Sequence, residues 1–372
     1  MSAADRVRSP RWWRKPVARW GLRLGVGVVL GVVAVQVVLA NTAELAGAGG
    51  YLERANGGWI AVAAVAECLS YLNFTVLQRR LLSAGGLHLG MPFLGCMSLA
   101  GNAISNTLPA GGAFATVFAY RQFRRRGADE ALTTWVVVAF TALTSVALAV
   151  LAIVGLLIAG EDGGVSGLVP LVVVLLVGPA VAVAVLLRPR LLLPTVVPVL
   201  RAVSRAVGRP RRDPGLAVSR LVERLEAVSP RGIDWAAGLT YAAGNWIADC
   251  SCLVAAFAAV GGQVPWRGLL LAYGAAQVVA NLPVTPGGLG VVEGSLTVAL
   301  VAFGGSTAQT VAAVLLYRIL SFWVVLPLGW AAWVGLEVNA RRHPMPVGVL
   351  TGTLVDEPGQ PDRLLRAAEV AP

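Results

Sequence analysis

The segment 276–296 holds the residues whose types and spacing are best suited to chemistry. It lies in an apolar stretch, but Pro283 and Pro286 each lack a backbone N–H, and Gly-Gly-x-Gly follows them. Glu293 then places a carboxylate in the same stretch. Irregular backbone survives in hydrocarbon only where protein buries it or water lines it. We therefore expect a polar site within a membrane-embedded region here.

A second broken segment lies earlier in the chain. Residues 106–112 and 281–288 both contain Asn, then Leu-Pro, then Gly-Gly. The residues expected to form the two breaks and their polar edges are Asn106, Pro109, Gly111, Gly112, Asn281, Pro283, Pro286, Gly287, Gly288 and Gly290. Helices that begin after Gly112 and after Gly288 would point their free N–H groups at these breaks, where they favour an anion such as a phosphate.

Charged side chains inside the apolar stretches complete the candidate site. Glu293 and Arg318 form the clearest pair, because a lone arginine in the last apolar stretch is costly. Two alternatives stay open for this pair, namely headgroup binding and a structural salt bridge. Asp249 and Glu67 are acids expected to be buried in the apolar stretches. Three alternatives stay open for each of them: to carry a proton or cation for coupling, to pair with Arg121, or to have a structural role alone.

Three amides in the same stretches are expected to join helices by hydrogen bonds: Asn102, Asn245 and Gln277. The four cysteines also lie in apolar stretches, at positions 68, 96, 250 and 252. We expect them to be small core residues and not disulfides or a zinc site.

The composition identifies a membrane protein. Of the 372 residues, 57% are hydrophobic and only 13% are charged, which is about half the charged share of a soluble protein. The net charge of +11 clusters beside the apolar stretches. This placement indicates topology and anionic lipid headgroups as its cause, and not nucleic acid.

The basic clusters predict how the chain crosses the membrane. Six spans are expected, at residues 22–40, 59–77, 132–160, 168–187, 234–260 and 308–336. The broken stretches 91–120 and 268–303 must each enter and leave on one side. Each limb of the first has about 15 residues, which is too short for a core of about 30 Å. The two would enter from opposite sides, so their tips would meet near the midplane and form a substrate site.

The predicted fold is therefore all-α, with about six spans and two inverted re-entrant helical hairpins in a transmembrane domain at 21–340. The basic, Trp-containing residues 1–20 are expected to be cytoplasmic. Residues 188–231, which contain ten arginines, form a cytoplasmic loop. Residues 341–372 are expected to form a disordered cytoplasmic tail.

Motifs for several reaction classes are missing from the sequence. The two histidines, His88 and His343, fall near membrane edges. The chain has no Ser/His/Asp arrangement, GxxxxGK[ST] loop, CxxC pair or HExxH. We therefore expect no catalytic residues, no cofactor and no metal.

Residues 283–293 read Pro-Val-Thr-Pro-Gly-Gly-Leu-Gly-Val-Val-Glu. This segment resembles the Pro-x-x-Pro-Gly-Gly-x-Gly-x-x-Glu motif of the flippase-like transmembrane domain of bacterial lysylphosphatidylglycerol synthases. The break at 106–112, the basic residues 121–126 and Arg318 in the last span are also similar to that family. The resemblance covers roughly residues 20–340.

The resemblance implies a plasma-membrane protein that moves a lipid with a polar headgroup between leaflets. It implies functional roles for Glu293 and Arg318, and a shaping role for the Gly and Pro residues of the breaks. Bifunctional members carry a soluble aminoacyl-transferase domain after the membrane part. This sequence ends soon after the last span, so that activity is not expected here.

Three hypotheses follow. The first is a translocase for a lipid or polyprenyl-phosphate-linked headgroup, which works by alternating access. The second is a non-transporting membrane partner of an envelope enzyme, such as a glycosyltransferase, with residues 188–231 as its docking surface. The third is a membrane-embedded transferase that acts on the lipid, with Glu293 or Asp249 as acid or base.

Overall fold

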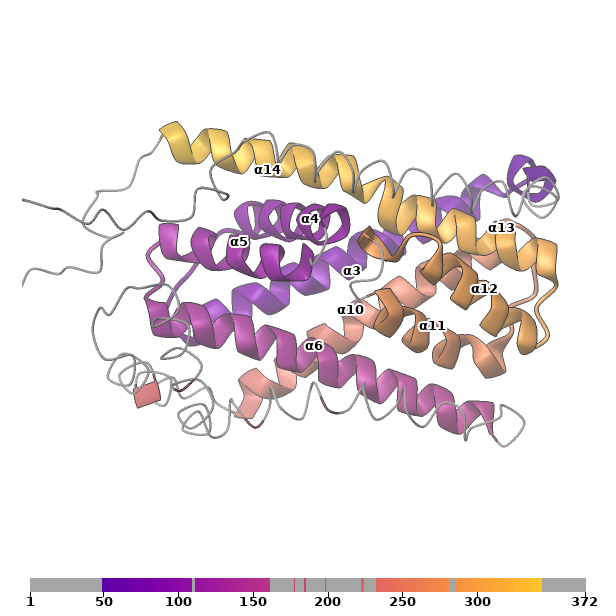
Figure 1. Ribbon diagram of the computed structural model, residues 1–372, viewed down its shortest axis with the longest axis horizontal. Helices are drawn as coiled ribbons and strands as arrows, with labels where there is room; N and C mark the ends of the chain where they lie inside the picture. The colour runs from indigo at the N-terminus through magenta and orange to yellow at the C-terminus, as the bar shows by residue number, and fades with distance from the viewer. Residues whose placement is uncertain are drawn as a thin grey trace, which may run out of the picture. The chain divides into compact units, whose positions relative to one another are not determined.

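The computed structural model describes residues 49–108, 111–160, 232–280 and 286–342, with a few isolated positions between 177 and 223. This described part is built from helices (Figure 1). The main elements are α3 (Gly57–Ala84), α4 (Met91–Thr107), α5 (Gly111–Arg125), α6 (Glu130–Ala159), α10 (Gly232–Ala259), α11 (Trp266–Ala280), η5 (Pro286–Gly288), α12 (Val291–Ala302), α13 (Thr307–Arg318), η6 (Ile319–Trp323) and α14 (Val325–Arg342).

Four helical stretches among the described residues are long and apolar enough to cross a membrane. They are Gly57–Ala84, Glu130–Ala159, Gly232–Ala259 and Thr307–Asn339. They match four of the six predicted spans, and the prediction of an all-α polytopic membrane protein is confirmed. The predicted spans 22–40 and 168–187, the loop 188–231 and nearly all of both predicted termini lie outside the described residues.

Side-chain caps explain where two of the long helices begin. The Asn56 side chain accepts hydrogen bonds from the backbone N–H groups of Gly58 and Trp59 at the start of α3, at 2.9 and 3.3 Å. Asp129 accepts from the N–H of Leu132 at the start of α6, at 2.6 Å. Both satisfy donors that the first helical turn leaves without a partner.

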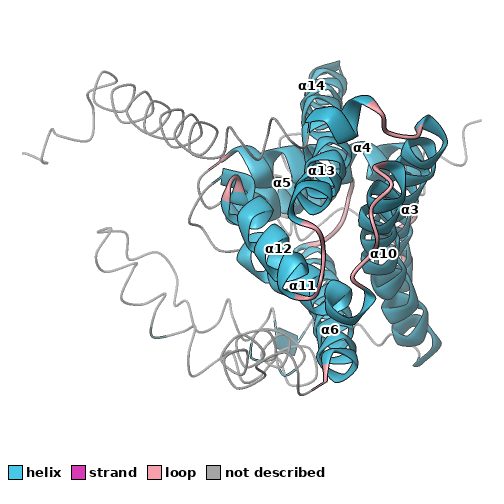
Figure 2. Cartoon of the chain, turned by 90° about the vertical axis from the view of Figure 1, so that its right-hand side faces the viewer, coloured by secondary structure: helices cyan, strands magenta, loops and turns pink. Residues whose placement is uncertain are grey.

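Helix α3 packs against α10, and α6 packs against the shorter α11 (Figure 2). Small residues bring α6 and α11 close together. A Cβ added at Gly155 would lie 2.5 Å from the backbone N of Leu271, and one at Gly274 would lie 2.9 Å from Cβ of Ala152. This is the small-residue packing typical of membrane helices, where dispersion contacts replace a hydrophobic driving force.

Two pairs of short helices lie where the hairpins were predicted. Helices α4 and α5 have 17 and 15 residues, and α11 and α12 have 15 and 12, so each is about 18–26 Å long. Helix α4 contacts α5, and α11 contacts α12. The first pair lies in the left half of Figure 1 and the second in the right half.

The two breaks meet each other. Helix α4 contacts η5, and a Cβ added at Gly287 would lie 3.0 Å from the carbonyl oxygen of Asn106. Both helix starts differ from the prediction, because α5 begins at Gly111 and α12 begins only at Val291. The later start of α12 follows from positive φ at Gly287, Gly288 and Gly290, which a right-handed helix cannot contain.

The last predicted span, 308–336, is not one continuous α-helix. One π-helical turn, Ile319–Trp323, separates α13 from α14. Its backbone bond runs from the N–H of Val324 to the carbonyl of Ile319, at 2.9 Å. Such turns are rare in proteins, and those that occur are often found at functional sites. This one follows directly after Arg318.

The close packing of α6 on α11 can be tested with one methyl group. Gly155→Ala places a Cβ against backbone atoms of α11 that cannot move independently, and we expect a loss of about 1–3 kcal/mol. Gly95→Ala in α4 is the matched control, because a Cβ there meets nothing within 4 Å. The measurement is thermal unfolding in detergent, and equal melting temperatures for the two variants would contradict this packing.

Candidate functional site

A cavity of about 910 Å³ lies between the helices. Its wall includes Asn106, Gly111 and Gly112 from the first break and Gly287 from the second. It also includes Arg318 and the acids Glu67 and Asp249. Ligand pockets usually measure about 300–1,000 Å³, so this one has room for a polar headgroup. The structure thus places seven of the fourteen predicted site and break residues around one space.

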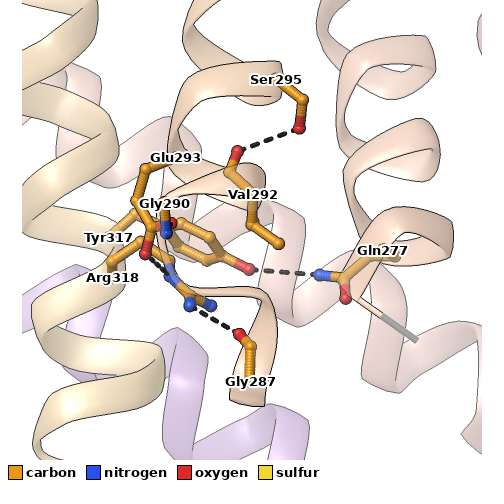
Figure 3. A network of polar contacts seen from close by, with 8 residues as sticks. All are labelled: Gln277, Gly287, Gly290, Val292, Glu293, Ser295, Tyr317 and Arg318. Atoms are coloured by element: carbon orange, nitrogen blue, oxygen red, sulfur yellow. Dashed lines mark hydrogen bonds and ion pairs between the residues drawn. The ribbon is translucent and has the colours of Figure 1, made fainter. Parts of the chain in front are cut away.

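Arg318 is held by two hydrogen bonds from its guanidinium group (Figure 3). Its Nε donates to Glu293 Oε1 at 2.7 Å, and its Nη2 donates to the carbonyl oxygen of Gly287 at 3.0 Å. The other carboxylate oxygen, Glu293 Oε2, accepts from the N–H of Gly290 at 2.7 Å. The pair therefore connects α13 to both sides of the second break.

Aromatic packing completes the setting of Arg318. Its guanidinium lies over the Phe322 ring, 4.5 Å from the ring centre. The same ring leaves no space at the break, because a Cβ added at Gly287 would lie 2.4 Å from Phe322 Cε2. Gly287 also has φ of 61°. Glycine is therefore required at this position both by its backbone conformation and by the close approach of Phe322.

The two members of the ion pair differ in what they face. Arg318 lines the cavity, but Glu293 does not. Arginine has five N–H donors, and contacts with described residues use two of those of Arg318. The remaining donors have no hydrogen-bond partner among the described residues, and Glu293 lies on the side of the guanidinium away from the cavity wall. Both alternatives for this pair, salt bridge and anion binding, are compatible with this geometry.

A second polar centre surrounds Asp249 on α10. Its Oδ2 accepts hydrogen bonds from the Tyr273 hydroxyl, from Gln277 Nε2 at 3.0 Å and from the Tyr317 hydroxyl at 2.9 Å. Asp249 therefore ties together α10, α11 and α13. The predicted alternative of a pair with Arg121 is wrong, since among the described residues tyrosine and glutamine side chains take its place.

Glu67 on α3 joins this centre. Its side chain lines the same cavity as Asp249 and lies close enough to act on that carboxylate electrostatically, and each residue is only 8% exposed. The sequence presents these acids far apart, and no spacing rule pairs them. The tyrosines 273 and 317 were also missed, although a hydroxyl in an apolar span signals a buried partner.

The amides of the site follow the predictions in two of three cases. Gln277 donates to Tyr317 as well as to Asp249, and Asn245 is hydrogen-bonded to Ser70 of α3 at 2.8 Å, so both join helices as expected. Asn102 does not join two helices. Its side-chain oxygen accepts a hydrogen bond from Asn106 Nδ2 at 2.7 Å within α4, because residues four apart share one helix face.

The cysteines agree only in part with the predictions, and several of the predicted break residues cannot be compared. The four cysteines are free, and Cys250 and Cys252 are buried as expected, but Cys96 is half-buried and Cys68 is exposed. The break residues Pro109, Asn281 and Pro283 lie outside the described residues, and Pro286 is the first residue of η5.

The ion pair can be measured by a double-mutant cycle with Glu293→Gln and Arg318→Gln. Each single change leaves one buried charge without its partner and should cost about 3 kcal/mol. The double variant should lose clearly less than the sum, because no charge is then uncompensated. The measurement is unfolding in detergent, with the exposed Glu130→Gln as control, and strict additivity would show that the pair is not coupled.

Comparison with known protein families agrees with this architecture. The family described as the lysylphosphatidylglycerol synthase TM region matches residues 22–329, which include both hairpins and the candidate site. A search of curated proteins finds no match. The family match spans most of the chain and confirms the resemblance seen in the motif at 283–293. The chain therefore belongs to the lysylphosphatidylglycerol synthase TM region family.

Proposed function

We propose that this protein translocates a lipid with a phosphate-containing headgroup, either a phospholipid or a polyprenyl-phosphate-linked lipid, across the plasma membrane. One observation carries the proposal. The guanidinium of Arg318 lines a cavity between two broken hairpins and is held in place from behind by Glu293. Membership in the family supports a lipid-related membrane function, and the translocation step is our inference.

The start of α5 offers a second set of donors for the phosphate. Its first residues, Gly111, Gly112 and Ala113, line the same cavity. The first N–H groups of a helix have no partner within the helix, and they favour an anion. The start of α12 is used differently from our expectation, because the Glu293 carboxylate already accepts from Gly290 there. The anion site is therefore built from α5 and Arg318.

The hairpin arrangement supports transport by alternating access. We interpret α4–α5 and α11–α12 as re-entrant elements of opposite orientation whose breaks meet near the midplane. Movement of one hairpin against the other would open the cavity to one side at a time. The positive-inside pattern supports a cytoplasmic location for both chain termini, which is part of this proposal. This function needs no catalytic residue, so we do not propose an enzyme.

The proposal predicts that Arg318→Ala slows lipid movement by about 10–100-fold, which corresponds to the loss of charge-assisted hydrogen bonds of 1.5–3 kcal/mol. Glu293→Gln should slow it as well, because Arg318 loses its anchor. Purified protein is reconstituted into liposomes that contain fluorescent phospholipids or polyprenyl phosphates, and a reductant bleaches the outer leaflet. Wild-type protein should let the signal fall below half.

The matched control is Arg80→Ala, which removes an exposed arginine at the end of α3. Folding of each variant is checked by size-exclusion chromatography and thermal unfolding. A wild-type rate in Arg318→Ala would refute the site. If wild-type protein moves no lipid, even with proton and sodium gradients, the hypothesis of a non-transporting partner of an envelope enzyme replaces this one.

A further inference from the structure

We propose that Glu67 and Asp249 form a proton-binding site on the cavity wall, and that a proton bound there moves together with the anionic headgroup at Arg318. The first half of this inference stands on the geometry of the two acids. The second half rests on the proposed function. Together they make the protein a proton–lipid symporter.

The surroundings of the two carboxyl groups require a proton on one of them. Both acids are buried and line the same cavity, and an ionised carboxylate has only acceptors. Each ionised oxygen therefore needs a donor, and the two acids differ in the donors that they have. Glu67 Oε2 is buried and has no donor among the described residues, whereas Asp249 Oδ2 accepts three hydrogen bonds. This difference assigns the negative charge to Asp249 and the proton to Glu67.

The groups around the pair fit one negative charge and not two. Burial of a carboxylate without a donor is costly, and two adjacent buried carboxylates repel each other. The titratable and charged groups that act on the pair come from α3, α10, α11 and α13, and they are Tyr71, Cys250, Cys252, Tyr273, Tyr317 and Arg318. Arg318 is the only cation in this set, and its direct partner is Glu293.

The proton site and the anion site are connected through one turn of α13. Tyr317 donates to Asp249, and the next residue is Arg318, whose charge acts on Asp249. All three line the same cavity. Loss of the proton would add a second negative charge beside the place where the phosphate binds. An anion at Arg318 therefore favours proton uptake, and by linkage the proton favours the anion.

This linkage has a defined charge balance. A phosphodiester headgroup carries one negative charge, so its movement with one proton transfers no net charge. A pH gradient should drive the lipid from the acidic side to the alkaline side, whichever way the protein is inserted. A membrane potential without a pH gradient should have no effect.

The first experiment examines the proton without any lipid movement. Infrared spectroscopy of the detergent-solubilised protein at neutral pH should show the C=O stretch of a buried protonated carboxyl group, which shifts in D₂O. Glu67→Gln should remove this band, because Glu67 is the acid that holds the proton, and Asp249 keeps its three donors and stays ionised. Glu130→Gln, at an exposed position, should retain it. If wild-type protein lacks the band, the bound proton is refuted.

The second experiment examines the coupling. Liposomes with fluorescent phosphatidylglycerol are given a pH gradient, and lipid movement toward the alkaline side should exceed the reverse by at least about fivefold, the low end of ordinary coupling energies. Glu67→Gln should lose this asymmetry, and Glu130→Gln should keep it. Asp249→Asn serves as a second variant, with size-exclusion chromatography as the check of folding.

The outcomes separate the two proposals. If the infrared band is present and lipid moves at equal rates in both directions, the symport is refuted while the translocase stands. If the band is present and no lipid moves under any gradient, both the proposed function and the symport are refuted, and only the proton site remains. Asymmetry that survives in both acid variants would also overturn the assignment of the coupling site.

Discussion

The salt bridge between Arg318 and Glu293 is the interaction on which the centre of this protein depends. A break in a membrane helix leaves backbone groups without partners, and an isolated charge in the same place is also costly. In this structure the backbone groups of the break and the two charged side chains satisfy each other. The Gly287 carbonyl accepts from the guanidinium, and the Gly290 N–H donates to the carboxylate. The break and the ion pair therefore stabilise each other.

A helix turn links this ion pair to the acid centre. Consecutive residues of a helix point about 100° apart, so Tyr317 reaches Asp249 while Arg318 reaches Glu293. The π-helical turn that follows brings Phe322 under the guanidinium and against the second break. Three consecutive parts of the last span therefore each have one contact: Tyr317 with the acid centre, Arg318 with Glu293, and the π-helical turn with the second break.

The two hairpins contribute unequally to this centre. The second brings a carboxylate that anchors Arg318, and its helix start is already occupied by that carboxylate. The first brings the start of α5 and the amide side chain of Asn106 to the cavity wall. Similar breaks in the sequence thus have different surroundings: the second holds the Arg318 side chain, and the first forms part of the cavity wall.

The sequence by itself determined the membrane class, four described spans, the positions of both breaks and the pairing of Glu293 with Arg318. These follow from local rules, since apolar length, Pro and Gly placement and the cost of a lone charge are visible within a short window. Only the tertiary structure decided that Glu67 meets Asp249, that Tyr273, Gln277 and Tyr317 surround it, and that a π-helical turn follows Arg318. Those contacts join helices that are distant in the sequence. They depend on how the helices pack, and no local sequence pattern encodes that packing.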